Sequence, residues 1–158
     1  MNNISLVKCT CEDAELLHKL QREAFMPLYD RYRDDETSPA LESIEAVTRK
    51  IADSEFYFIC DGDVPIGGVR VRLFRNADEN IYNISPIFIL PDRCDKGLGT
   101  AVMEKLFAMY ADADKWSLAT IKQDERNCHF YEKLGFVPTG SSTVINERMT
   151  IVGYEKKV

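Results

Sequence analysis

Hydrophobic and polar positions along the first third of the chain change from strand-like alternation to helical spacing. Residues 4–9 (ISLVKC) predict a first strand. Residues 11–25 place leucines and a phenylalanine at helical spacing, with acidic residues in the first turn. Residues 26–40 are rich in tyrosine and acid and have little period, and a second helix is predicted at about 40–53.

The middle of the chain reads as a hairpin followed by an interrupted strand. Residues 56–74 predict two strands around an Asp-Gly-Asp turn. Residues 81–90 predict a fourth strand that contains Pro86. Because a proline inside a strand belongs at a bulge or an edge, we expect this strand to be distorted at Pro86.

The remaining elements complete a mixed α/β fold with a partly antiparallel sheet. They are a helix to about Tyr110, a strand over 115–121, a short helix over 125–135 stopped by Gly135, and closing strands over 136–140 and 148–156. No repeat, low-complexity tract or linker interrupts the 158 residues, so we expect one domain over 1–158.

Composition indicates an ordinary globular protein, with 45% hydrophobic and 29% charged residues. The apolar runs are too short to span a bilayer, and no apolar leader precedes a cleavage site, so we expect a cytoplasmic protein without a membrane partner. The net charge of −6 comes without a visible basic patch, so no nucleic acid is expected. Such acidity serves solubility or attracts a cationic partner.

The five cysteines form an odd, scattered set, which argues against a disulfide framework. Cys9 and Cys11 would share one face of a strand, but no second ligand pair accompanies them. We therefore expect no metal site, and free buried cysteines instead.

The segment ILPDRCDKGLGT, which starts at Ile89, joins the fourth strand to the next helix through two glycines. Free N–H groups and the helix dipole favour an anion at such a helix start. It is not a nucleotide P-loop, because Gly99 is followed by Thr100 and Ala101, nor a dinucleotide fingerprint, because Val102 replaces the third glycine. A turn without a ligand is the alternative.

A second motif follows the next strand, NCHFYEKLGF. Together with the upstream P…KGLG turn, it resembles the GNAT superfamily of N-acetyltransferases over roughly Ile81 to Pro138. The predicted element order agrees with that family. The resemblance implies a mixed, mostly antiparallel sheet of about six to seven strands, flanked by about four helices, with a β-bulge in the fourth strand.

The resemblance also implies acetyl-CoA as cosubstrate and assigns residues to it. Backbone groups of Ile87, Phe88 and Ile89 would face the acetyl group and the pantetheine, and one of the last two would supply the oxyanion donor. The pyrophosphate would lie on backbone N–H groups of Asp95, Lys96, Gly97, Leu98, Gly99 and Thr100. Tyr131 would protonate the leaving thiolate; the alternative is a core aromatic beside Phe130.

Three positions depart from the family pattern. Cys94 stands where glutamine or arginine is preferred, and Asp124 stands where members often have asparagine. Asn127 would then serve the pantetheine, or only cap the helix or face solvent. The glutamate that some members use as general base falls on Ala119, so the base is unassigned.

Two groups of residues are candidates for the base and the acceptor wall. Glu79 and Tyr82 flank the start of the fourth strand, and the run Asp34, Asp35 and Glu36 follows the first helix. Carboxylates and tyrosine rings would suit a cationic amine. The alternatives are a solvated loop and a base that acts through water.

The leading hypothesis is acetyl transfer to a primary amine of a small molecule. A protein N-terminus or lysine as acceptor, a non-catalytic acyl-CoA-binding module, and a nucleotide or phosphosugar binder are the alternatives. Folds of this family often dimerise, so the resemblance allows a homodimer, and the sequence does not decide the oligomeric state.

Overall fold

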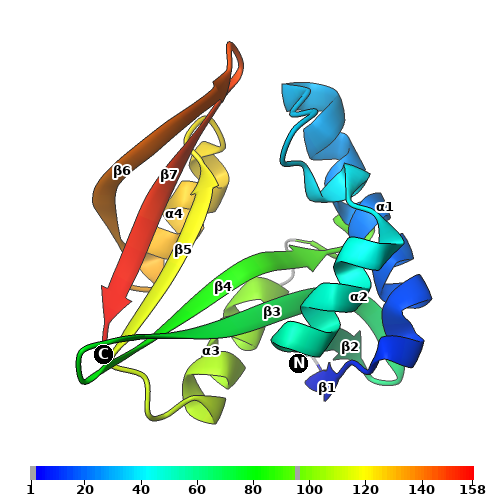
Figure 1. Cartoon of the computed structure of the whole chain (residues 1–158), viewed down its shortest axis with the longest axis horizontal. Helices are drawn as coiled ribbons and strands as arrows, with labels where there is room; N and C mark the ends of the chain where they lie inside the picture. Colours follow the sequence, from blue (N-terminus) through cyan, green and yellow to red (C-terminus); the bar gives the residue numbers. More distant parts are fainter. Residues whose placement is uncertain (1–2, 95–96) are drawn as a thin grey trace.

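One seven-stranded sheet with helices on both faces forms the body of the protein (Figure 1). The computed structural model describes residues 3–94 and 97–158. The strands are β1 (Ile4–Lys8), β2 (Glu55–Asp61), β3 (Val64–Asn76), β4 (Glu79–Ile89), β5 (Lys115–Ile121), β6 (Val137–Asn146) and β7 (Met149–Lys157). The α-helices are α1 (Ala14–Tyr32), α2 (Ile44–Asp53), α3 (Leu98–Met109) and α4 (Glu125–Lys133).

The strand order is β1-β2-β3-β4-β5-β7-β6, and every neighbouring pair is antiparallel except β4 and β5. This arrangement confirms the predicted mixed, mostly antiparallel sheet with flanking helices. Alternate residues of β2 point to opposite faces, so Phe56 and Phe58 enter the core beneath α1 and α2, whereas Ile59 enters the core beneath α3 and α4.

Helix α1 runs seven residues further than the pattern predicted, past Pro27 to Tyr32. Its last turns are held by tertiary packing, which outweighs the hydrogen bond that proline removes. Phe25 packs edge-on against Phe88 with ring centroids 5.5 Å apart, and Tyr32 is buried. The helix ends at Arg33, whose φ of 52° is left-handed and whose N–H donates to the Tyr29 carbonyl.

Helix α2 begins at Ile44, later than predicted, because a short 3₁₀ turn at Pro39–Leu41 precedes it. Ser43 caps the helix by accepting the N–H of Ala46 at 3.1 Å. The 3₁₀ turn contacts α1 although six residues separate them in the chain, because Gln21 of α1 donates to the Pro39 carbonyl at 3.0 Å. The residues between the two helices therefore fold back along α1.

Strand β4 contains the predicted bulge. Val69 of β3 pairs with Ile87, but Val71 pairs with Ile84, so β4 has one residue more than β3 across this interval. The extra length falls at Ser85 and Pro86, the position that the proline indicated.

Beyond the bulge, β4 and β5 separate. Their parallel pairing covers only Ile81–Asn83 against Lys115–Ser117, whereas β5 stays paired with β7 up to Ile121. Figure 1 shows the two strands diverging toward the ends that approach α1 and the β6–β7 hairpin. The sheet is thus split on one side, with backbone groups of β4 facing the opening.

Candidate functional site

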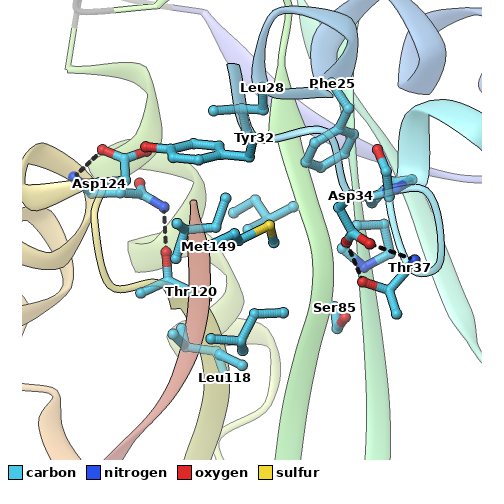
Figure 2. Close-up of a pocket in the computed structure, with 18 of the residues that line it drawn as sticks. Phe25, Leu28, Tyr32, Asp34, Thr37, Ser85, Leu118, Thr120, Asp124 and Met149 are labelled. Carbon is cyan, nitrogen blue, oxygen red and sulfur yellow. Dashed lines mark hydrogen bonds between the residues drawn. The ribbon is translucent and has the colours of Figure 1, made fainter. Parts of the chain in front are cut away.

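A cavity of about 320 Å³ lies where β4 and β5 part (Figure 2). Four parts of the chain form its walls: α1 with the loop after it, the bulge of β4, the ends of β5 and β7, and the start of α4. The side chains that line it include Phe25, Leu28, Tyr32, Asp34, Ser85, Ile87, Thr120, Asp124, Asn127, Tyr131, Met149 and Ile151. Its volume is in the range of small-molecule sites.

The backbone of β4 presents alternate residues to this opening. The N–H of Leu90 donates to the Ile66 carbonyl on β3 at 2.8 Å. Backbone groups alternate along a strand, so the amide of Phe88 also faces β3, whereas those of Ile87 and Ile89 face the gap. Of the three residues that the resemblance suggested, Ile87 and Ile89 can offer backbone hydrogen bonds to a ligand, and Phe88 fills the core beneath α1.

Cys94 folds back onto the end of this strand. Its thiol lies 3.5 Å from the carbonyl oxygens of both Ile89 and Leu90. Burial raises the pKa of the Cys94 thiol, and the charge of Arg126 opposes that shift. The thiol therefore supports the end of β4 at the position where the family prefers a longer polar side chain.

The N-terminus of α3 presents three backbone amides that have no acceptor within the helix. Gly97 caps the helix with a left-handed φ of 74°, and the first intrahelical bond runs from the Ala101 N–H to the Gly97 carbonyl at 3.2 Å. The amides of Leu98, Gly99 and Thr100 come before it and have no intrahelical acceptor. They can hold an anion. Asp95 and Lys96, which the resemblance also implicates, lie outside the described residues.

The two glycines of this turn serve different purposes. A Cβ on Gly97 would meet no atom of the described chain within 4 Å, so this glycine is required by its backbone conformation. A Cβ on Gly99 would lie 3.0 Å from Cζ of Phe130, so this glycine allows α3 to approach α4. Gly99 thus faces a side chain of α4.

Tyr131 is both a core aromatic and a cavity residue. It is 4% exposed and packs edge-on against Phe130 and Phe136, at centroid distances of 5.1 and 5.8 Å. Burial raises the pKa of Tyr131 well above its usual range, and the charge of Asp124 adds to this, while a hydrogen bond with Asn127 opposes it. The phenol therefore stays protonated at neutral pH and can act only as a proton donor there.

Asp124 and Asn127 form the start of α4. The Asp124 carboxylate accepts the N–H of Asn127 at 3.1 Å and caps the helix. The Asn127 amide in turn donates to the hydroxyl of Thr120 at 2.8 Å (Figure 2). Both residues line the cavity and are partly exposed, and the Asn127 side chain connects α4 to the end of β5.

Of the proposed base residues, only Asp34 reaches the cavity. It is 3% exposed, and its carboxylate accepts the N–H groups of Glu36 and Thr37 and the Thr37 hydroxyl. These hydrogen bonds stabilise the loop that contains Asp34. Asp35 and Glu36 are exposed, and Asp35 accepts the Tyr29 hydroxyl at 2.5 Å.

The other pair of base candidates lies at the far end of β4. Glu79 is 3.9 Å from the Lys115 ammonium, and the Tyr82 hydroxyl donates to Asp112 at 2.9 Å. Neither residue lines the cavity. The sequence hypothesis for these two residues therefore receives no support from the geometry.

The cavity also contains residues that the sequence did not single out. Tyr32 and Phe25 come from the end of α1, and Met149 and Ile151 come from β7. They have no common motif, and only the tertiary fold brings them together. Within the described residues, no group of three or more His, Cys, Asp or Glu side chains is placed to hold a metal, and no helix is long and apolar enough to cross a membrane.

Comparison with known proteins assigns this arrangement to a family. The model of the Acetyltransferase (GNAT) family matches residues 15–136. Among solved structures, the chain is similar to the PaiA N-acetyltransferase from Thermoplasma acidophilum in complex with coenzyme A, at 20% identity over 99% of both chains with a TM-score of 0.71.

Two further structures share the fold. One is a spermidine N-acetyltransferase chimera from Vibrio cholerae and hSSAT, at 18% identity, covering 98% of this chain and 94% of that one, with a TM-score of 0.73. The other is a Salmonella typhimurium acetyltransferase that modifies the N-terminal serine of a 50S ribosomal subunit protein, at 13% identity, covering 100% and 96%, with a TM-score of 0.77. With the family model matching most of its length, the chain belongs to the GNAT family of acetyltransferases and is an N-acetyltransferase.

Proposed function

We propose that this enzyme transfers an acetyl group from acetyl-CoA to the primary amine of a small molecule, by direct attack in a ternary complex. The observation that carries the proposal is the cavity itself. It joins the split side of the sheet, where Ile87 offers free backbone groups, to the buried phenol of Tyr131.

The residues present fit acetyl-CoA. The amides of Leu98, Gly99 and Thr100, which have no acceptor within α3, suit a pyrophosphate, and the gap-facing backbone of Ile87 and Ile89 suits an extended amide-containing arm. The PaiA enzyme, with the same fold, is described in complex with coenzyme A. When bound, acetyl-CoA supplies an activated acyl group with a thiolate as leaving group.

Two groups of the chain would act on the reacting atoms. The N–H of Ile89, turned toward the gap, donates to the thioester oxygen as negative charge develops on it. The phenol of Tyr131 gives its proton to the departing sulfur, and its raised pKa keeps that proton available across the neutral range. Asn127 acts on the same phenol, because its interaction with Tyr131 opposes the rise in the Tyr131 pKa.

The walls of the cavity favour a small acceptor. The hairpin between β6 and β7 reaches the end of α1, where the amide of Asn146 donates to the carbonyls of Tyr32 at 2.8 Å and Arg33 at 3.2 Å. These bonds join the hairpin to α1 at one side of the cavity, which favours a compact acceptor. The fold itself is shared by a spermidine enzyme and by one that modifies a protein N-terminus, so it does not choose between them. A protein acceptor is the second candidate.

Calorimetric titration with acetyl-CoA, with ATP as comparator, tests the cosubstrate. We expect acetyl-CoA to bind more tightly than ATP, because only acetyl-CoA has an arm for the β4–β5 gap. An amine panel then compares the wild type with Tyr131→Phe, which we expect to lower kcat by about 100-fold while leaving acetyl-CoA affinity within a few-fold. Absence of acetyl-CoA binding overturns the proposal.

A further inference from the structure

Asp124 occupies the corner where β5 turns into α4, with its side chain at the cavity. Its position is fixed on three sides. The backbone N–H donates to the Ile121 carbonyl at 3.1 Å, the backbone carbonyl accepts the Cys128 N–H at 3.1 Å, and Oδ1 accepts the Asn127 N–H at 3.1 Å. The carboxylate is therefore held in place before any substrate enters, as a reacting group requires.

Two carboxylates line the cavity in the described part of the chain, Asp34 and Asp124, and their states differ. Asp34 accepts bonds from its own loop at both oxygens. Among the described residues, Asp124 has a hydrogen bond at Oδ1 alone, so Oδ2 can accept from a ligand. Figure 2 shows Asp124 on the opposite side of the cavity from Asp34, with the Tyr32 hydroxyl pointing toward it.

Part of the wall is apolar, beside hydroxyl groups such as those of Tyr32, Ser85 and Thr120. Phe25 and Leu28 of α1 face Met149 and Ile151 of β7 across the space, and the Phe25 ring is fixed by its edge contact with Phe88. Burying an apolar group there is favourable, by about 25 cal/mol per Å². A second ammonium against the same side chains would lose its hydration without a partner.

We propose that Asp124 is the proton acceptor of the reaction and that the cavity selects an amine with one basic nitrogen and an apolar tail. This inference rests on the function proposed above. The neutral amine forms the nitrogen–carbon bond, and the carbon–sulfur bond breaks. The nitrogen loses one proton to Oδ2 of Asp124, while the sulfur gains one from Tyr131. The proton then passes from Asp124 through solvent to the Tyr131 oxygen, which restores both groups.

Several titratable groups face Asp124 and belong in any account of its pH dependence. They are Tyr29 and Tyr32 of α1, Asp34 of the loop after α1 and Tyr131 of α4, which line the same cavity, while Arg126 and Cys128 belong to the same helix as Tyr131. Burial keeps the Tyr131 phenol neutral near neutral pH, so this phenol adds no charge to the cavity there.

The variant Asp124→Asn tests the proton acceptor. Asparagine caps a helix as well as aspartate does, so α4 keeps its first turn while the charge is lost. Glu125→Gln is the matched control, because it removes the same charge from the neighbouring exposed position outside the cavity. Thermal unfolding and acetyl-CoA titration of all three proteins report folding and cosubstrate binding separately from transfer.

We expect Asp124→Asn to lower kcat by at least about 100-fold near neutral pH, with the deficit shrinking as pH rises and solvent takes the proton. Glu125→Gln should match the wild type. Wild-type kcat/KM should be at least about 10-fold higher for phenethylamine than for putrescine. Wild-type-like turnover by Asp124→Asn, or a preference for putrescine, overturns the inference and leaves the acetyltransferase proposal intact. A wild type that binds no acetyl-CoA contradicts the proposed function instead.

Discussion

Arg70 donates a hydrogen bond from Nη1 to the carbonyl oxygen of Ser85, 3.3 Å away, inside the bulge of β4. Its Nε donates to the Ser54 hydroxyl at 2.7 Å. Arg70 is 8% exposed and lies between Val69 and Val71, opposite the extra residue of β4. Burial lowers the pKa of Arg70, and the nearby Arg72 adds to this effect. A buried guanidinium therefore supports the distortion that opens the sheet.

Arg70→Met should damage the cosubstrate site beyond its effect on stability. The Ser85 carbonyl loses its donor, which costs about 1–3 kcal/mol when the group is buried, and the bulge loses its support. We expect the KM for acetyl-CoA to rise by about 10-fold or more. Steady-state kinetics at saturating amine measure this change.

Ser54→Ala is the matched control for this substitution. It removes the acceptor for Nε but leaves the bond to Ser85. It should reduce stability with little change in KM. Equal KM values for Arg70→Met and Ser54→Ala would contradict the assigned role of Arg70.

Gly99→Ala should destabilise the protein although alanine is the better helix former. The new Cβ would lie 3.0 Å from Cζ of Phe130, and overpacking of this kind costs about 1–3 kcal/mol. The gain in helix propensity is about 1 kcal/mol. In a Phe130→Leu background the obstructing atom is gone, so Gly99→Ala should become neutral or stabilising.

A double-mutant cycle by urea denaturation measures the coupling between these two positions. Identical free-energy changes in the two backgrounds would show that Gly99 is required for another reason, such as direct approach of a phosphate.

The buried phenol of Tyr131 should make stability depend on alkaline pH. Below about pH 10, the ordinary tyrosine pKa, the phenol is protonated in both the folded and the unfolded state. Above it, the unfolded chain loses the proton while the folded protein keeps it, because burial raises the folded-state pKa. The free energy of unfolding therefore falls as pH rises, by up to about 1.4 kcal/mol per pH unit for this group.

Tyr131→Phe should flatten this dependence by the contribution of one proton. The slope that remains comes from other buried groups. Burial raises the pKa of Cys9 to about 12, and burial also raises the pKa of Tyr110 well above its usual range. Urea denaturation of both proteins at about pH 9 and about pH 11 gives the two slopes. Parallel slopes would mean that the Tyr131 phenol ionises as freely in the folded protein as in the unfolded one.

Asn146→Asp should loosen the mouth of the cavity. The aspartate keeps an oxygen for the Arg148 N–H but cannot donate to the carbonyls of Tyr32 and Arg33. We expect faster hydrogen exchange at the Arg33 amide and a KM for the amine raised several-fold, with kcat less affected. Ser142→Ala on the same hairpin is the control. Unchanged exchange at Arg33 would show that the hairpin does not hold α1.

The elements that the sequence predicted best are those in which the spacing of hydrophobic residues reflects burial on one face. Strand β5 has the predicted bounds, because Trp116, Leu118 and Thr120 are buried and alternate with more exposed positions. Strand β6 extends to Asn146, well beyond the predicted residue 140, and most of its positions are exposed, so no hydrophobic alternation marks it. Its ladder with β7 defines it, and that is a tertiary interaction.

The residues of the candidate site also fall into two groups, those that local sequence motifs predict and those that only the fold brings together. Tyr131, Asn127 and the start of α3 lie in local motifs, so their positions could be predicted from the resemblance. Tyr32 and Met149 are far apart in sequence and meet only across the split sheet. Asp124 was visible as a departure from the family pattern, but only the fold indicates that this departure places a carboxylate at the cavity.

Acetyl transfer itself is the most direct test of the account. Purified protein is incubated with acetyl-CoA and phenethylamine, and mass spectrometry quantifies N-acetylated amine and free coenzyme A over time. We predict equal amounts of the two products, with formation slowed about 100-fold in both Tyr131→Phe and Asp124→Asn but not in Glu125→Gln. Free coenzyme A without acetylated product, across a panel of primary amines, would contradict it.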